Sequence, residues 1–446
     1  MSLLIEGGRV VRRLSPPLIE HADILVDGTR IAAIGTGLDE TAAQRIDASG
    51  CLVVPGNVNS HTHAYSALAR GMPLGVAAPR SFLEILQRLW WRLDRALDEE
   101  SIRASALVAA RDALLAGTTT LVDHHASPNA IDGSLDIIAG AFTQVGIRSV
   151  LAYEVSDRDG ADRARASLAE NERFMRSSSW LHCPISRPMV GAHAPFTLSD
   201  ATLEACVGLA AQSGCGLHIH AGEDAIDSGA IRRLGQARAL NSRLLAAHAI
   251  HVDSDEAHQL AERGVVVAHN ARSNMNNGVG HAPIDLLGDR VTLGTDGIGS
   301  DMWAEAMTAY FRQREGQPDA GMDWVVNALA HGATFVGRLF DEPQLGTISV
   351  GAPADLVVLD YSPPTLLDAN DLYAHWVFGT SAAAVTDVVV SGEIVVRDRM
   401  LTRVDEADID RFARRQARAL WARVEDTPVH TFEPVTSRAP ATAGLS

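Results

Sequence analysis

Between residues 55 and 347, short apolar runs alternate with longer segments whose apolar positions recur at helical spacing. The short runs are β-prone, and we expect strands at residues 57–61, 118–123, 149–154, 189–193, 216–220, 244–248, 265–269 and 291–296. Helices are expected among the intervening and following segments, at residues 99–116, 161–174, 199–212, 230–240, 254–262 and 304–315. Repeated alternation of strand and helix, with eight strands, predicts an α/β protein with a (β/α)8 TIM barrel.

Outside this region, β-prone runs are separated by glycine turns instead of helices. A closed barrel has no free edge, so these outer strands must find partners elsewhere. We therefore predict that residues 1–54 and 348–402 form one small β-sandwich built from both chain ends, beside a barrel of residues 55–347. A helix is expected within residues 403–426. The remaining residues, 427–446, have the composition of a flexible tail.

Polar residues close most of the expected barrel strands. These residues are His61, Asp123, His193, His220, His248, His269 and Asp296. In a (β/α)8 barrel the active site is built at the carboxyl ends of the strands. A random distribution of histidines would not end so many strands, so the pattern indicates a functional site at this rim.

The best metal-binding candidates are His61, His63, His220 and Asp296. Residues two apart on a strand point the same way, so His61 and His63 can bind one ion together. Three imidazoles and a carboxylate leave a position open for water, which is typical of a catalytic metal. Glu223 lies three residues past His220, where it can reach that water without binding the metal. For any one of these residues taken singly, a satisfied core histidine or a capping carboxylate would be the favoured interpretation, and only the combination favours a metal site.

Composition narrows the possible partners and locations. The 446-residue chain has a formal charge of -17, and this argues against nucleic acid or an anionic membrane as a partner. No signal peptide or membrane-spanning segment is recognisable, so we expect a cytoplasmic protein whose four cysteines are reduced thiols. The sequence contains no lysine. Because no carboxylated lysine can then bridge two metals, a single divalent metal ion is the simpler expectation.

The set His61, His63, His220, Glu223, His248 and Asp296 resembles the amidohydrolase superfamily, in its branch of cytosine deaminases and triazine hydrolases. The resemblance is strongest to SsnA-type aminohydrolases, also named chlorohydrolases. It covers nearly the whole chain. Its supporting stretches are residues 89–100, 123–128, 191–197, 269–277 and 294–302.

The resemblance implies one metal ion, with zinc expected and iron as the alternative. It also implies that His248 faces the substrate and the attacking water, and that His193 binds the substrate. Many deaminase relatives have a glutamate after a tryptophan in the helix that follows the first strand. The equivalent here is Asp94. Because its side chain is shorter, the resemblance does not decide whether Asp94 contacts the substrate.

Two further substrate-binding candidates lie in loops. Asp301 is a carboxylate where many relatives have asparagine, so it either binds an amino or amidine group of the substrate or caps a helix. One residue of the pair His124 and His125 should point into the barrel mouth. We assign His125 to that position.

Together these features predict a hydrolytic deaminase in which Glu223, His248 and Asp296 are catalytic. It would release ammonia from an amino-substituted purine, pterin or pyrimidine-like ring, with metal-activated water as the nucleophile. The same site could instead release chloride or an amine from a triazine, or open a cyclic amide. A non-catalytic metal-binding subunit is the second alternative. We expect a small heterocyclic substrate as the ligand and a homo-oligomeric assembly.

Overall fold

A computed structural model describes residues 2–38, 41–181 and 183–434. Eight parallel strands form the barrel, as the alternation predicted. They are β6 (Asn57–Thr62), β7 (Thr118–His125), β8 (Arg148–Val155), β10 (Val190–Ala192), β11 (Leu217–Ala221), β12 (Leu244–His248), β13 (Val266–His269) and β14 (Val291–Leu293). The short strand β9 (Ser186–Pro188) pairs with β8, and a bridge between Thr62 and Asp296 joins the last strand to the first.

Helices surround the barrel because its strands are buried on both faces. They include α3 (Glu99–Leu115), α4 (Ser134–Val145), α5 (Ala161–Met175), α7 (Asp200–Ser213), α8 (Ala230–Gln236), α9 (Ser254–Glu262), α10 (Ala271–Asn277), α12 (Met302–Gly316) and α13 (Asp323–Phe340). Helix α3 begins with a capping box in which Asp98 and Ser101 satisfy each other's backbone N–H groups. Helix α13, which the sequence analysis did not predict, packs against β6 and β14.

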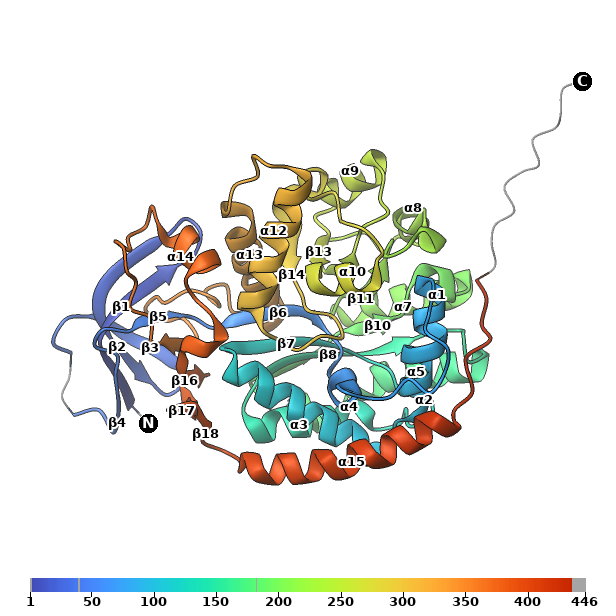
Figure 1. The fold of residues 1–446 in the computed structure, drawn as a ribbon, viewed down its shortest axis with the longest axis horizontal. Coiled ribbons are helices and arrows are strands. Elements are labelled where there is room, and N and C mark those ends of the chain that lie inside the picture. Colours follow the sequence, from blue (N-terminus) through green and yellow to red (C-terminus); the bar gives the residue numbers. More distant parts are fainter. Residues whose placement is uncertain (1, 39–40, 182, 435–446) are drawn as a thin grey trace, which may run out of the picture.

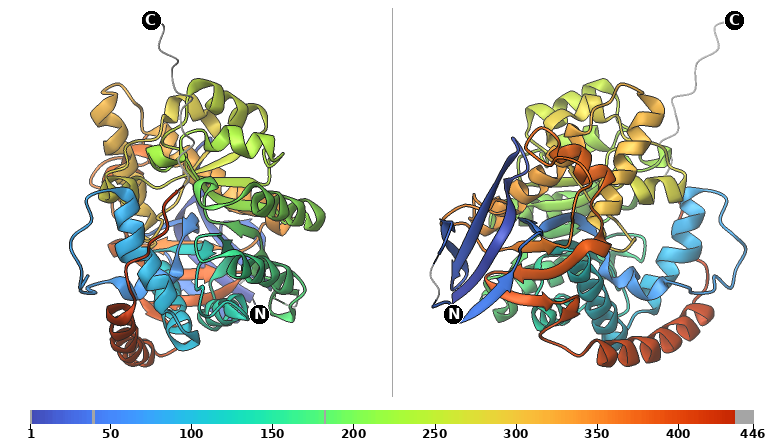
Figure 2. Two further views of the ribbon diagram at one scale, coloured as in Figure 1. Left: turned by 90° about the vertical axis from the view of Figure 1, so that its right-hand side faces the viewer. Right: turned by 60° about the vertical axis from the view of Figure 1, so that its left-hand side comes forward.

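Strands from both chain ends form one mixed sheet (Figures 1 and 2). Its strands are β1 (Ser2–Arg13), β2 (Leu18–Asp27), β3 (Arg30–Gly35), β4 (Gln44–Asp47), β5 (Leu52–Pro55), β15 (Leu356–Leu359), β16 (Val385–Val390), β17 (Glu393–Arg397) and β18 (Met400–Leu401). The two chain ends meet where β5 pairs antiparallel with β15. Buried residues from both ends, such as Ile24 and Val389, share one hydrophobic core. This confirms the expected joining of the chain ends.

The last helix, α15 (Glu406–Asp426), lies across α3 and α2 (Trp91–Ala96), and its apolar stripe packs on them. After it, the chain continues along α2 toward α1 (Phe82–Ile85), as Figure 1 shows. The sequence predicted a flexible tail from residue 427. The structure instead packs residues 427–434 against this helical segment, through hydrogen bonds and aromatic contacts. Residues 435–446 lie outside the described part of the chain.

None of the helices in the described part of the chain combines the length and the apolar character that crossing a membrane requires.

Candidate active site

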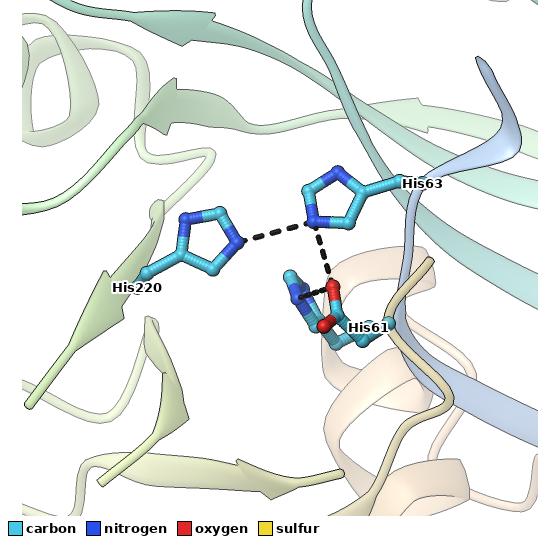
Figure 3. A group of neighbouring side chains, drawn as sticks. His61, His63 and His220 are labelled. Atoms are coloured by element: carbon cyan, nitrogen blue, oxygen red, sulfur yellow. Dashed lines mark hydrogen bonds and ion pairs between the residues drawn. The ribbon is translucent and has the colours of Figure 1, made fainter. Parts of the chain in front are cut away.

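Three histidines and one aspartate converge at the carboxyl ends of the barrel strands. His61 and His63 come from β6, His220 from β11, and Asp296 follows β14. One nitrogen or oxygen of each lies within 4.8 Å of the corresponding atoms of the others. Nε2 of His63 is 3.1 Å from Nε2 of His220 and 3.0 Å from Oδ1 of Asp296. The three imidazole rings point toward one another in Figure 3. The structure thus brings together all four residues predicted as metal ligands.

The hydrogen bonds behind these rings fix which nitrogen faces the centre. Nδ1 of His63 donates to the carbonyl oxygen of His124 at 2.6 Å, and Nδ1 of His220 donates to that of His193 at 2.7 Å. In a neutral ring, a proton on Nδ1 leaves a lone pair on Nε2. With both rings neutral, two such lone pairs would face each other across 3.1 Å, an arrangement that a proton or a metal ion between them stabilises. Carbonyl partners of this kind orient histidines that bind metal.

His61 is held by a side chain instead of a carbonyl. Its Nδ1 lies 2.8 Å from Nε2 of His218, which is fully buried. Nε2 of His61 is 3.4 Å from Oδ1 of Asp296 and makes no hydrogen bond with any described residue. Burial lowers the pKa of His61 to about 3, so this ring is neutral. A buried nitrogen lone pair without a donor is what a metal ligand should show before it binds.

The centre of this group favours positive charge. Burial lowers the pKa of His63, but its contact with Asp296 and the charges of Asp296 and Glu154 outweigh burial, and its pKa rises to about 9. Burial raises the pKa of Asp296, yet its contacts with His61 and His63 hold it well below its ordinary range. An ionised carboxylate beside three imidazoles suits a divalent metal ion.

Asp296 is held in an uncommon backbone conformation, with φ of 54°. A non-glycine residue at positive φ is strained, and such residues gather at functional sites. Ser273 donates a hydrogen bond to Oδ2 of Asp296, so Oδ1 is the oxygen that faces the histidines. The tight turn thereby aims one carboxylate oxygen at the centre.

Glu223 and His248 form the adjacent wall of the centre. Oε2 of Glu223 lies 3.5 Å from Nε2 of His248, and Nδ1 of His248 donates to Oδ1 of Asn274 at 2.8 Å. Glu223 also accepts a 3.4 Å hydrogen bond from Asn277. Burial and the negative charge of Asp296 raise the pKa of Glu223 well above its ordinary value. A carboxyl group with a raised pKa can carry a proton near neutral pH, as a general acid–base catalyst must.

A pocket opens onto this centre. Its outer wall is largely aromatic and aliphatic. That wall comes from α1, α2 and the turn between them (Leu86–Trp90). The lining residues are His63, Tyr65, Phe82, Leu86, Trp90, Trp91, Glu154, His193, His220, Glu223, Asn277, Asp296 and Gly297. Aromatic faces beside a few polar groups are suited to a flat heterocycle.

Of the four residues predicted to bind substrate, only His193 lines this pocket. Asp94 is buried behind the wall, where its carboxylate pairs with Arg158 at 2.5 Å. His125 is also buried and lies 2.9 Å from the Ser127 hydroxyl. Asp301 is the N-cap of α12 and accepts hydrogen bonds from the backbone of its first turn.

Several residues of the site were not predicted from the sequence. Glu154 lies at the end of an expected strand, so the signal used for the histidines would also have found it. His218 precedes His220 by two residues and therefore faces the same side of β11. Trp91 and Asn277 carried no such signal, because their positions in the pocket depend on how α2 and α10 pack.

The C-terminal segment supports the pocket wall from outside. His430 donates its backbone N–H to the carbonyl oxygen of Gln87, and the Gln87 side chain donates to Phe432. The rings of His430 and Phe432 contact Trp91 at centroid distances of 5.1 and 5.8 Å. Trp91 in turn lies 5.9 Å from the His193 ring. Residues 427–434 thus fix the segment that carries the aromatic wall.

Comparisons with known proteins agree with this geometry. The model of the amidohydrolase family matches residues 52–395. A 5'-deoxyadenosine deaminase from Methanopyrus kandleri is 31% identical over 435 residues, which cover 92% of this chain and 97% of that protein. A 5-methylthioadenosine/S-adenosylhomocysteine deaminase from Desulforudis audaxviator is 33% identical over 426 residues, covering 90% of this chain and 94% of that protein.

Solved structures show the same fold. The crystal structure of an adenosine deaminase from Xanthomonas campestris with bound zinc matches with a TM-score of 0.80 at 26% identity, covering 94% of this chain and 98% of that one. The zinc complex of an atrazine chlorohydrolase from Arthrobacter aurescens matches with a TM-score of 0.79 at 24% identity, covering 94% of this chain and 100% of that one. At that identity the second match shows the fold alone.

Proposed function

The chain belongs to the amidohydrolase family, and from this premise we propose that it is a metal-dependent aminohydrolase that deaminates an adenine nucleoside. The relatives named above act on 5'-deoxyadenosine and on 5-methylthioadenosine or S-adenosylhomocysteine. Such nucleosides are amino-substituted purines, one of the ring classes expected from the sequence. The narrower resemblance to SsnA-type aminohydrolases stays a prediction.

One observation carries the proposal. Three imidazole nitrogens and a carboxylate oxygen converge beside Glu223 on the floor of a pocket with aromatic walls. His61, His63, His220 and Asp296 would hold the metal, and zinc suits this set of nitrogen and oxygen donors. When bound, such a metal lowers the pKa of a water molecule toward neutrality.

The chain's own residues supply positioning and proton transfer. Glu223 can hold a proton at Oε2 and pass it to the leaving nitrogen, because its pKa is raised and it faces the centre. Asn274 fixes Nδ1 of His248, so Nε2 of His248 faces the reacting group beside Glu223. Trp90 and Trp91 border the pocket and can exclude water from the bound ring.

The proposal is tested by measuring ammonia release from adenosine, 5'-deoxyadenosine, 5-methylthioadenosine and S-adenosylhomocysteine with zinc-loaded enzyme. We expect turnover of at least one of them. Glu223→Gln should reduce kcat by about 10²–10⁴-fold, because glutamine cannot carry the proton. Its metal content should equal that of the parent.

Glu262→Gln is a matched control, since that carboxylate is exposed on α9, away from the pocket. It should leave kcat unchanged. Full activity of Glu223→Gln, or no ammonia from any adenine nucleoside, would contradict the proposed function.

A further inference from the structure

The pocket wall carries a second buried carboxylate, Glu154, on the strand β8. Its side chain is 4% exposed and lines the same pocket as Glu223. Oε1 accepts a 2.5 Å hydrogen bond from Arg158. Oε2 lies 3.4 Å from Nδ1 of His124 without forming a hydrogen bond to it. Within the described chain, no hydrogen bond reaches Oε2 of Glu154.

Arg158 cannot satisfy this carboxylate alone, because it is shared among three acidic groups. Its guanidinium contacts Asp94 at 2.5 Å, Glu154 at 2.5 Å and Asp159 at 3.3 Å. Burial raises the pKa of Glu154, but the positive charge of Arg158 helps to hold it well below its ordinary range. An ionised carboxylate is purely an acceptor and has room for several hydrogen bonds.

His193 places a second acceptor beside Glu154. Nδ1 of His193 is 2.7 Å from the hydroxyl of Thr197, whose own proton goes to the Ala194 carbonyl oxygen at 3.0 Å. A proton therefore sits on Nδ1, and in the neutral ring Nε2 of His193 is an acceptor. Nε2 lies 4.0 Å from Oε1 of Glu154.

Oε2 of Glu154 therefore borders the pocket with only the long contact to His124, so a ligand that excludes water from the pocket should supply a hydrogen-bond donor there. We propose that Glu154 is a substrate-binding residue that accepts a hydrogen bond from a donor group distinct from the amino group that leaves. This inference rests on the proposed function. The ring nitrogens of adenine are acceptors, and 5'-deoxyadenosine has no 5'-hydroxyl, so the donor shared by these nucleosides is a sugar hydroxyl on C2' or C3'.

The position of Asp94 supports this assignment. Asp94 was the residue expected to contact the substrate from the helix after the first strand, but its Oδ2 pairs with Arg158 and the residue lies outside the pocket lining. Arg158 bridges Asp94 and Glu154, and only Glu154 lines the pocket. The carboxylate available to the substrate thus comes from β8.

The test compares kcat/KM for adenosine, 2'-deoxyadenosine and 3'-deoxyadenosine with zinc-loaded parent and Glu154→Gln. The parent should lose about 10–100-fold on the analogue that lacks the contacted hydroxyl, the range for a hydrogen bond to a charged group. Glu154→Gln should lose a similar factor on adenosine, mostly through KM. On the analogue that lacks the contacted hydroxyl, kcat/KM of Glu154→Gln should be little lower than that of the parent. The substitution and the missing hydroxyl remove the same interaction.

Asp94→Asn is the matched control, since it alters another partner of Arg158 outside the pocket. It should keep the parent's discrimination between adenosine and the deoxy analogues. Glu154→Asp provides a second variant that keeps the negative charge beside Arg158 but withdraws it from the pocket. It should lose the discrimination as Glu154→Gln does, even if the glutamine variant folds poorly.

The outcomes separate this inference from the proposed function. No ammonia from any nucleoside with the parent contradicts the proposed function. Turnover with equal losses on all three substrates in Glu154→Gln overturns the role of Glu154.

The groups His63–His124–Glu154 and Glu154–His193–His220 are also close enough to hold a cation. Two metals per chain in the parent and one in Glu154→Gln would therefore assign Glu154 to a metal and overturn the inference.

Discussion

At the scale of single residues, the three histidines expected to bind the metal differ in what holds their second nitrogen. His63 and His220 donate to backbone carbonyl oxygens, whose positions the barrel strands fix. His61 depends on the side chain of His218, whose Nδ1 is buried without a hydrogen-bond partner among the described residues. A buried unsatisfied group lowers stability, so we expect the other ring nitrogen of His218 to have a functional role that offsets this cost. Orienting His61 is that contribution.

We predict that His218→Leu weakens metal binding by about 10–100-fold, the range reported for partners that orient a metal-binding histidine. Competition with a chelator measures the affinity directly. His218→Gln should restore most of it, because its amide oxygen can accept the proton from Nδ1 of His61. His269→Leu removes another buried histidine, one that ends β13, and should leave affinity unchanged. Parental affinity in His218→Leu would show that His61 needs no such partner.

At the scale of elements, the loop before α12 decides between the two roles considered for Asp301. Its carboxylate accepts hydrogen bonds from the backbone N–H groups of Trp303 and Ala304, both at 3.0 Å. These groups are otherwise unpaired at a helix start. Asp301 is outside the pocket lining, so the structure favours the capping role.

Asp301→Ala should therefore lower the free energy of unfolding by about 1 kcal/mol, as loss of an N-cap does. Asp301→Asn should be neutral, because asparagine caps helices about as well as aspartate. Urea unfolding measures the loss of stability in Asp301→Ala. The KM for the nucleoside substrate checks that Asp301→Asn is neutral. A KM that rises in Asp301→Asn while stability is unchanged would return Asp301 to the substrate site.

At the scale of the whole molecule, the chain end and the pocket are coupled. Helix α15 carries the chain past the barrel, and residues 427–434 then pack on α2 and the turn before it (Figure 1). Trp91 connects this segment to His193 in the pocket. Contacts between residues far apart in the sequence thus set the position of the aromatic wall.

Ending the chain after Asp426 should raise KM by roughly tenfold, which corresponds to about 1.4 kcal/mol of lost binding. The metal content should stay the same, because the metal-binding residues belong to the barrel strands and their ends. Ending the chain after Pro434 is the matched control, since it keeps every described contact of this segment, and its KM should equal the parent's. An unchanged KM in the chain that ends after Asp426 would show that the barrel alone fixes the aromatic wall.

The sequence by itself determined the strands, most of the helices and the residues expected to bind the metal. Alternation along the chain specifies strands and helices because it reflects which faces are buried. The strand ends then place His61, His63, His220 and Asp296 at one rim, because parallel strands in a barrel all end on the same side. Helix α13 also shows an apolar stripe, from Val325 to Phe340, that the same criterion could have detected.

Only the tertiary structure decided which of the remaining polar residues reach the pocket. Asp94 and Glu154 are both buried carboxylates paired with Arg158, and only packing places one behind the wall and the other in it. Likewise, residues 427–434 have the composition of a tail but are held by Gln87 and Trp91. Such contacts join residues distant in sequence, and local patterns carry no information about them, because they depend on how whole elements pack together.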